Sequence, residues 1–210
     1  DTTSLSFTSA DVASPTMTIT ATEVSDGDTS NDGTLSLIFI SNEAATGFAV
    51  GDISVANGAI SAFATTNPST YTATFTPSGT GARNKVCTID VAAGTFTDAA
   101  GNNNTAAPQF NWTHDSVLPI LSSSSPADNA TAVAISANIV LTFSKAVDAE
   151  SGNIVIKKTS DNSTVETIGV TSGQVTGSGT TTITINPLSD LTGETGYYEK
   201  IAATCFDDAY

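Results

Sequence analysis

The sequence predicts an all-β protein made of two β-sandwiches in tandem, and three features of the chain support this prediction. Stretches in which apolar and hydroxyl-bearing residues alternate recur along the 210 residues, and polar turns separate them about every ten residues, as in sandwich folds. No stretch has the apolar period of about 3.6 residues that marks an amphipathic helix. The segment 91–102 has a second, shorter copy at 201–210, so the chain contains a domain-sized repeat.

The strands of the first domain are expected where alternation is clear. In 70–76, Tyr71, Ala73 and Phe75 share one face and threonines occupy the other, which is typical of a half-buried strand. The stretch 34–41 has apolar residues on both faces, which predicts a central strand covered on both sides. The expected strands are 1–9, 17–22, 34–41, a short strand within 48–60 that the turn Asn57-Gly58 breaks, 70–76, 85–91 and 108–115.

The second domain shows the same alternation after a joint at 122–127, which is rich in serine and contains a proline. Glu199 is the exception, because it has the same parity as Tyr197 and Ile201. Either a β-bulge shifts the register there or the carboxylate meets a partner. The expected strands of this domain are 139–144, 154–156, 181–186 and 197–203.

Composition and charge exclude several classes of function. Six Lys and Arg residues stand against 21 Asp and Glu residues, for a net charge of −15, so the chain is expected to repel nucleic acids and anionic membranes. No run of about 18 apolar residues and no leader sequence is present, which predicts no membrane insertion. Because the first residue is Asp, we expect a processed product or an excised piece.

The candidates for catalysis are few. The single histidine, His114, has the parity of Phe110 and Trp112 and is expected to be structural. No Gly-x-Ser-x-Gly motif, phosphate loop or histidine metal cluster is present. The adjacent carboxylates Asp207 and Asp208 have no recognisable cleft around them. The sequence therefore predicts no enzyme and no required cofactor.

Calcium is the one ion that the sequence suggests. Four oxygen-bearing side chains fall within one turn between strands, and a hard cation prefers several such ligands. The other interpretation is that these are ordinary solvated turn residues. The candidate ligands are Asp26, Asp28, Asn31 and Asp32, with Asp98 and Asp115 as further candidates near the joint between the domains.

The two cysteines, Cys87 and Cys205, fall one in each domain, so no disulfide within a domain is expected. Each is either a buried thiol or one half of a covalent link between domains or subunits. The chain also has four Asn-x-Ser/Thr sequons, a number that its composition would produce by chance. The candidate glycosylation sites are Asn111, which alternation points outward, and Asn103, Asn129 and Asn162.

The two copies of the repeat end differently. When Phe96 is aligned with Phe206 and Asp98 with Asp208, the first copy continues into the strand 108–115, whereas the second copy stops. We therefore expect the second sandwich to lack its closing strand. A sandwich in this state leaves backbone groups unpaired and seeks a strand.

The start of the chain carries a matching surplus. Leu5 and Phe7 repeat the layout of Phe110 and Trp112, so this strand has the parity to close the vacancy in another copy, as in donor-strand complementation. Because the donating and accepting surfaces differ, the contact would propagate into a filament. The expected segments are a donor strand at 1–13, a first domain at 14–116 and an incomplete second domain at 117–210.

Particular motifs of both domains resemble known families. With Pro126–Val133, Ile139–Ser144, Ser151–Ile156, Ile185-Asn-Pro187, Asp190-Leu191 and Tyr197-Tyr198, residues 117–210 resemble the bacterial Ig-like domain of S-layer and surface proteins. That family continues past the final Asp turn into a closing strand, and this chain does not. With Gly47-Phe48, Gly51–Ile53, Asn57-Gly58 and Phe96–Asn102, residues 14–116 resemble an Ig-like repeat found in tandem arrays of secreted or surface proteins.

The resemblance implies two tandem Ig-like sandwiches that are secreted or lie at the cell surface as spacers, adhesin stalks or lattice components. We expect copies of the chain, or homologous repeats, as its partners in a filament. One alternative is that the chain is a window from a continuous array, in which the next repeat supplies the strand. Another is a ligand-binding module of an adhesin, for which exposed aromatic residues at Tyr197 or Tyr198 give slight support.

Overall fold

A computed structural model describes residues 4, 6, 8–79, 81 and 84–208. The chain forms two compact units that divide between Val117 and Leu118. Among the described residues the only helix is the single 3₁₀ turn Val50–Asp52, and no helix there has the length and hydropathy to cross a membrane. The predicted all-β class is confirmed.

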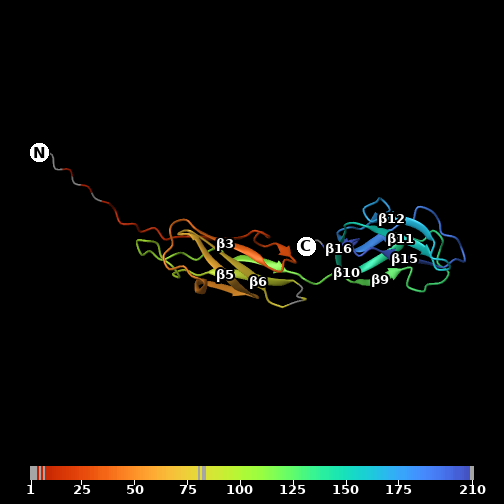
Figure 1. The fold of residues 1–210 in the computed structure, drawn as a ribbon, viewed down its shortest axis with the longest axis horizontal. Coiled ribbons are helices and arrows are strands. Elements are labelled where there is room, and N and C mark those ends of the chain that lie inside the picture. The colour runs from red at the N-terminus through yellow and green to blue at the C-terminus, as the bar shows by residue number, and fades with distance from the viewer. Residues whose placement is uncertain (1–3, 5, 7, 80, 82–83, 209–210) are drawn as a thin grey trace. The chain divides into compact units, whose positions relative to one another are not determined.

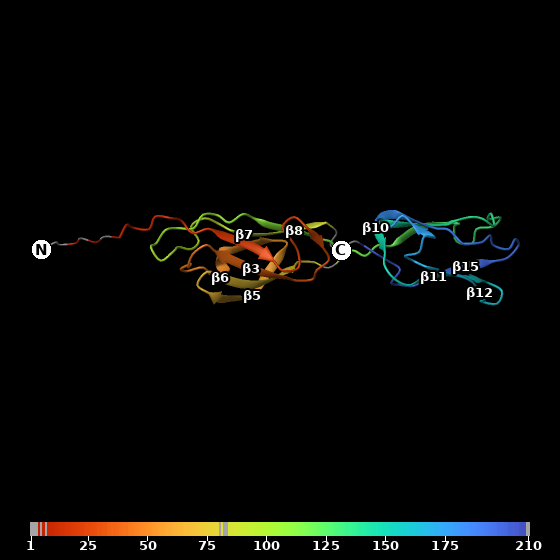
Figure 2. The same cartoon turned by 90° about the horizontal axis from the view of Figure 1, so that it is seen from above.

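The first unit is a sandwich of two four-stranded sheets, which Figures 1 and 2 show from two directions. Neighbouring strands are antiparallel, except that β2 and β8 run parallel. One sheet has the order β1 (Met17–Ala21), β3 (Leu35–Ser41), β6 (Thr70–Pro77), β5 (Gly58–Asn67). The other has the order β2 (Thr29–Ser30), β8 (Phe110–His114), β7 (Lys85–Val91), β4 (Ile53–Ala56).

Alternating side chains of both sheets fill the core of the first unit. Phe39, Phe75 and Trp112 are fully buried, and Phe75 meets Trp112 edge to face with ring centroids 6.3 Å apart. The expectation that both faces of β3 are covered is wrong, because Ile40 is 47% exposed. A two-layer sandwich covers only the inner face of each sheet.

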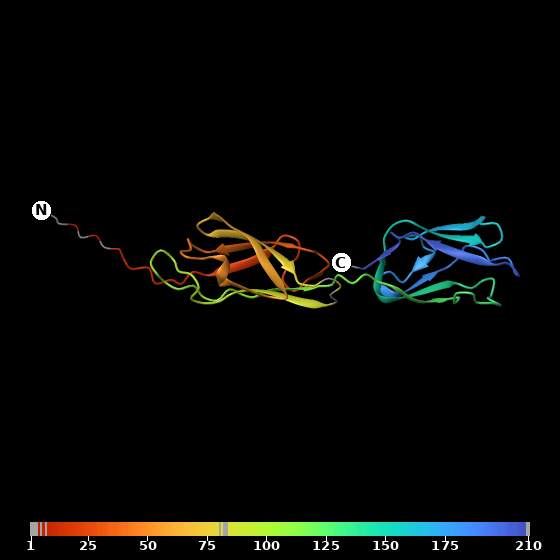
Figure 3. The ribbon, with the colours of Figure 1, turned by 60° about the horizontal axis from the view of Figure 1, so that its bottom comes forward.

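The second unit also has two layers, which are seen edge-on in Figure 3. Leu141, Ile154, Ile168 and Ile183 are fully buried between them. One sheet has the order β9 (Leu121–Ser125), β10 (Ile139–Ala149), β14 (Thr180–Ile185), β13 (Val175–Thr176), and β16 (Phe206–Asp207) pairs with the end of β10. The other has the order β12 (Thr164–Gly169), β11 (Asn153–Lys158), β15 (Tyr197–Ile201).

Two expectations about the segments that flank the domains need correction. The predicted joint 122–127 is largely the strand β9, which pairs with β10. Around the predicted strand 1–9, the described residues Ser4, Ser6 and 8–14 are exposed and form no strand. Leu5 and Phe7 themselves lie outside the described residues.

Candidate functional site

Strand β15 lies at the edge of its sheet in the second unit. It pairs with β11 on one side, and no described strand pairs with its other side. The N–H of Ala202 donates to Asn153 O at 3.2 Å, and the N–H of Thr159 donates to Gly196 O at 3.0 Å. Gly196 and Ala202 therefore bond to the β11 side. Hydrogen-bonded and non-bonded pairs alternate along an antiparallel ladder, so the backbone N–H and C=O groups of Tyr197 and Glu199 point toward the open side.

In the first unit the corresponding edge is covered. Strand β7 corresponds to β15, because Val91 lies opposite Ile53 of β4 as Ile201 lies opposite Ile154 of β11. The far side of β7 pairs with β8, and Ile89 lies opposite Phe110. The first unit therefore contains a strand for which the described part of the second unit has no counterpart.

A cavity of about 800 Å³ opens in the second unit beside this edge. Residues of both sheets line it, including Ser124 of β9, Ile139 of β10, Ile156 of β11 and Tyr197 of β15. Strands β9 and β15 are the edge strands of the two sheets on this side. We call the opening between them the seam.

Two loops border the seam cavity. The N–H of Leu191 donates to Ile135 O at 2.9 Å, which joins the loop after β14 to the loop between β9 and β10. Val133 is 41% exposed and Ile135 is 47% exposed, and both line the cavity. The seam thus combines unpaired strand backbone with accessible apolar side chains, which is the combination that binds an extended segment.

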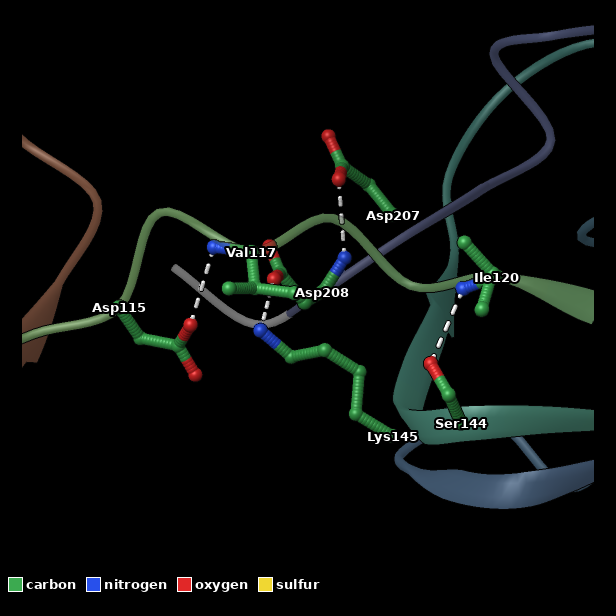
Figure 4. A network of polar contacts seen from close by, with 7 residues as sticks. All are labelled: Asp115, Val117, Ile120, Ser144, Lys145, Asp207 and Asp208. Atoms are coloured by element: carbon green, nitrogen blue, oxygen red, sulfur yellow. Dashed lines mark hydrogen bonds and ion pairs between the residues drawn. The ribbon is translucent and has the colours of Figure 1, made fainter. Parts of the chain in front are cut away.

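A buried ion pair holds the turn that follows β15. The ammonium of Lys145 lies beside the Asp208 carboxylate (Figure 4). The N–H of Asp208 donates to Asp207 Oδ1 at 2.9 Å, and the N–H of Ile120 donates to Ser144 Oγ at 3.1 Å. Asp207 pairs with β10 in the strand β16. These contacts fix the chain just after the open strand against β10.

The first unit gathers three carboxylates at the corresponding turn. Ligand oxygens of Asp11, Glu43 and Asp98 lie within 4.8 Å of one another. The N–H and the Nδ2 group of Asn102 donate to Asp98 at 2.9 and 2.7 Å, and these bonds lower the pKa of Asp98. Partial desolvation, and then the charges of Asp98 and Asp11, raise the pKa of Glu43. The pKa values of Glu43 and Asp98 therefore shift in opposite directions.

Three of the other predicted calcium ligands accept hydrogen bonds within the first unit. Asp26 Oδ1 accepts bonds from the N–H and Nδ2 of Asn111 at 2.7 and 2.9 Å. Asp28 Oδ2 accepts the Ser25 N–H at 2.8 Å, and Asp115 Oδ1 accepts the Val117 N–H at 3.1 Å. Among the acidic, histidine and cysteine residues that the structure describes, only the trio of Asp11, Glu43 and Asp98 forms a cluster. Asn31 and Asp32 are not part of it.

Both thiols are buried in the cores of separate units and are not bonded to each other. Burial raises the pKa of Cys87 and of Cys205. A thiol in this state is unreactive, which favours the buried-thiol interpretation. His114 is also buried, and its ring lies 5.4 Å from that of Trp112.

The sequons differ in how accessible their amides are. The side chain of Asn111 is partly buried and its Nδ2 donates to Asp26, so its glycosylation stays a prediction. Asn103, Asn129 and Asn162 are exposed. Asn162 accepts the Tyr198 hydroxyl at 3.0 Å through its Oδ1, which leaves its Nδ2 open.

Sequence reasoning did not identify Asp11, Glu43 or Lys145. The structure supplies the missing alignment of the two units, because Thr46 pairs with Thr97 as Asp148 pairs with Asp207. This correspondence aligns Glu43 with Lys145, each close to the aspartate of its turn. Once the units are aligned in this way, a negative charge in one stands where the other has a positive charge, and this difference marks both contacts.

Comparison with known proteins shows two family matches along the chain. A family model described as a bacterial Ig-like domain matches residues 11–113, and a second model with the same description matches residues 115–210. No curated protein matches the chain.

Two solved structures are similar to the chain. One is the N-terminal part of the bacterial S-layer protein SbsC, with 10% identity and a TM-score of 0.32 over 88% of this chain. The chain spans 43% of that structure. The other is the tandem Ig repeats of Dlar, with 8% identity and a TM-score of 0.19 over 93% of this chain and 91% of that one.

Proposed function

The chain belongs to the bacterial Ig-like domains, of which it holds two in tandem, and from this premise we propose that it is a structural module of an extracellular surface protein whose copies join head to tail by strand complementation. Tandem sandwiches of this kind serve as spacers and scaffolds rather than as catalysts. Copies of the chain are its partners in this proposal, and the cell surface is its location.

The open edge of β15 carries the proposal. In the first unit, β8 supplies Phe110 and Trp112 to the core, and both are buried. In the second unit the corresponding place is bordered by the seam cavity and by unpaired backbone groups of β15. An added strand would gain main-chain hydrogen bonds along the edge and bury apolar side chains in the cavity.

The segment 1–13 is the proposed donor. Its alternation puts Leu5 and Phe7 on one face and serine on the other. The described residues of this segment form no strand with their own chain. Donor and acceptor are different surfaces, so each added copy leaves both kinds of end free and the assembly grows as a filament.

Replacing the two donor side chains tests the proposal. The L5S/F7S variant keeps the chain length and removes both apolar anchors, so it should remain monomeric where the unaltered chain forms filaments. The S6A variant changes the other face of the same segment and should assemble normally. Sedimentation velocity and negative-stain electron microscopy at micromolar concentration give the readout.

Two outcomes would refute the proposal. Monomers of the unaltered chain at all concentrations would mean that no second copy closes the seam, as expected if residues that follow in one polypeptide supply the strand. Filaments that persist in L5S/F7S would show that another surface joins the copies.

A calcium-stiffened stalk or ligand-binding module of a surface adhesin is the second candidate. The observation that favours calcium is the cluster of Asp11, Glu43 and Asp98, whose oxygens are the type that Ca²⁺ prefers. A bound ion would tie Asp11, which precedes β1, to the body of the first unit. Calcium titration followed by thermal melting tests the ion, and a glycan array or cell-adhesion assay tests the ligand-binding role.

A further inference from the structure

Glu199 occupies a core-facing position in the middle of β15. Its neighbours of the same parity, Tyr197 and Ile201, pack against the core of the second unit. The β11–β15 ladder runs without a register shift, and it places Glu199 opposite the buried Ile156. A bulge therefore does not turn the side chain outward. Glu199 is nevertheless exposed, because no described strand covers this part of the seam.

The first unit has a fully buried residue at the same position. Ile89 lies opposite Val55 of β4, as Glu199 lies opposite Ile156 of β11. Ile89 is covered by β8, where Phe110 lies directly opposite it. The first unit therefore has the apolar Ile89 at this position, opposite an apolar residue of its closing strand. The second unit has the carboxylate of Glu199 there, and no described strand covers it.

A carboxylate at this position changes what a closing strand must offer. An incoming strand would cover Glu199, and burying an ionised group without a partner is strongly unfavourable. The same inner face shows how a carboxylate can be accommodated. Glu166, also opposite Ile156, accepts the Gln174 amide at 2.7 Å and the Leu188 N–H at 3.1 Å. No described group donates to Glu199.

Resting on the proposed strand complementation, we propose that Glu199 is the residue of the seam that selects the incoming strand and sets its register. The strand that fits carries a hydrogen-bond donor opposite Glu199, such as a Ser or Thr hydroxyl or a basic side chain. Apolar residues two and four positions further along enter the cavity. A strand with an apolar residue opposite Glu199 is rejected.

The segment 1–13 satisfies this requirement with its two largest apolar residues, Leu5 and Phe7, in one register. Pairing antiparallel to β15 with Thr3 opposite Glu199 brings Leu5 opposite Tyr197 and Phe7 level with Thr195, and both of these positions line the cavity. The β8 register would instead place Leu5 opposite the carboxylate. Glu199 therefore favours a register two residues away from the one that the first unit uses.

Binding of labelled peptides with the sequence of residues 1–13 tests the selection. The acceptor is the full L5S/F7S chain, whose own segment does not compete, with and without the additional change Glu199→Ile. The T3V peptide should bind the Glu199 acceptor about tenfold more weakly than the unaltered peptide, the loss expected for a hydrogen bond to a charged group. On the E199I acceptor, T3V should bind at least as well as the unaltered peptide. The S6A peptide, altered on the other face, should bind both acceptors unchanged.

The outcomes separate the two ideas. If the unaltered peptide binds and T3V weakens binding equally on both acceptors, or on neither, Thr3 and Glu199 are not coupled and the selection by Glu199 is refuted while strand complementation stands. If no peptide binds either acceptor, strand donation by this segment is refuted, and the inference with it.

Discussion

The ammonium of Lys145 lies beside the Asp208 carboxylate, and both side chains are buried, with 7% and 3% of their surface exposed. The aligned residues of the first unit, Glu43 and Asp98, carry two negative charges instead. The repeat therefore uses one geometry with opposite electrostatics. In the second unit the positive charge next to the aspartate is the ammonium of Lys145. In the first unit the carboxylate of Glu43 lies next to the aspartate instead.

Replacing Lys145 with methionine should destabilise the second unit by about 3 kcal/mol, because it leaves a buried carboxylate without its counter-charge. The double variant K145M/D208N should recover part of this loss. Differential scanning calorimetry measures the second unit, and the fluorescence of the single tryptophan, Trp112, provides a control on the first. A loss as large in the double variant as in K145M would contradict the role of the ion pair.

Placing lysine at Glu43 should reproduce the second unit's arrangement in the first. E43K removes one of three clustered negative charges and adds a positive one, so in chelator it should raise the melting temperature of the first unit by a few degrees. E43Q, which only removes charge, should give a smaller rise. Trp112 fluorescence during thermal unfolding is the measurement.

Calcium provides the companion test of the same cluster. If Asp11, Glu43 and Asp98 hold the ion, added calcium raises the melting temperature of the unaltered chain, because a ligand that binds the folded state stabilises it. The shift should disappear in E43K. An equal shift in both proteins would place calcium elsewhere, and no shift in either would rule out a stabilising site at this cluster.

Strands whose side chains alternate cleanly could be predicted from the sequence. The prediction 85–91 coincides with β7, and 70–76 differs from β6 by one residue, because burial of one face imposes a period of two. Strand β9 was missed because it is an edge strand whose serines stay largely exposed. Its pairing with β10 defines it, and no apolar face marks it in the sequence.

The candidate sites, too, could be predicted from the sequence only in part. The parity of Glu199 was visible in the sequence, but only the unbroken β11–β15 ladder excludes a bulge. The cluster of Asp11, Glu43 and Asp98 joins three segments that are far apart in the chain. Local density of acidic residues pointed instead to the turn at 26–32, where the aspartates bond their own backbone or a neighbouring strand.

Both cysteines should resist modification in the folded protein. Cys87 and Cys205 are completely buried, and burial raises their pKa, so thiolate at the surface is scarce. A thiol reagent such as dithionitrobenzoate should react at neutral pH only as fast as each unit opens, and readily after denaturation. Rapid reaction of the native chain at either position, located by peptide mapping, would contradict this and revive the covalent-link hypothesis.

Mild acid should destabilise the first unit through His114. Burial lowers the pKa of His114, and the nearby Lys85 charge acts in the same direction, whereas Asp115 and Asp32 oppose the shift. As pH falls below about 6.5, the unfolded chain binds a proton that the folded chain does not, so stability falls toward the lower folded pKa by at most about 1.4 kcal/mol per pH unit. Urea unfolding followed by Trp112 fluorescence between pH 7.5 and pH 5 measures this slope. The H114F variant should flatten the profile, and an unchanged slope in H114F would assign the acid sensitivity to other groups.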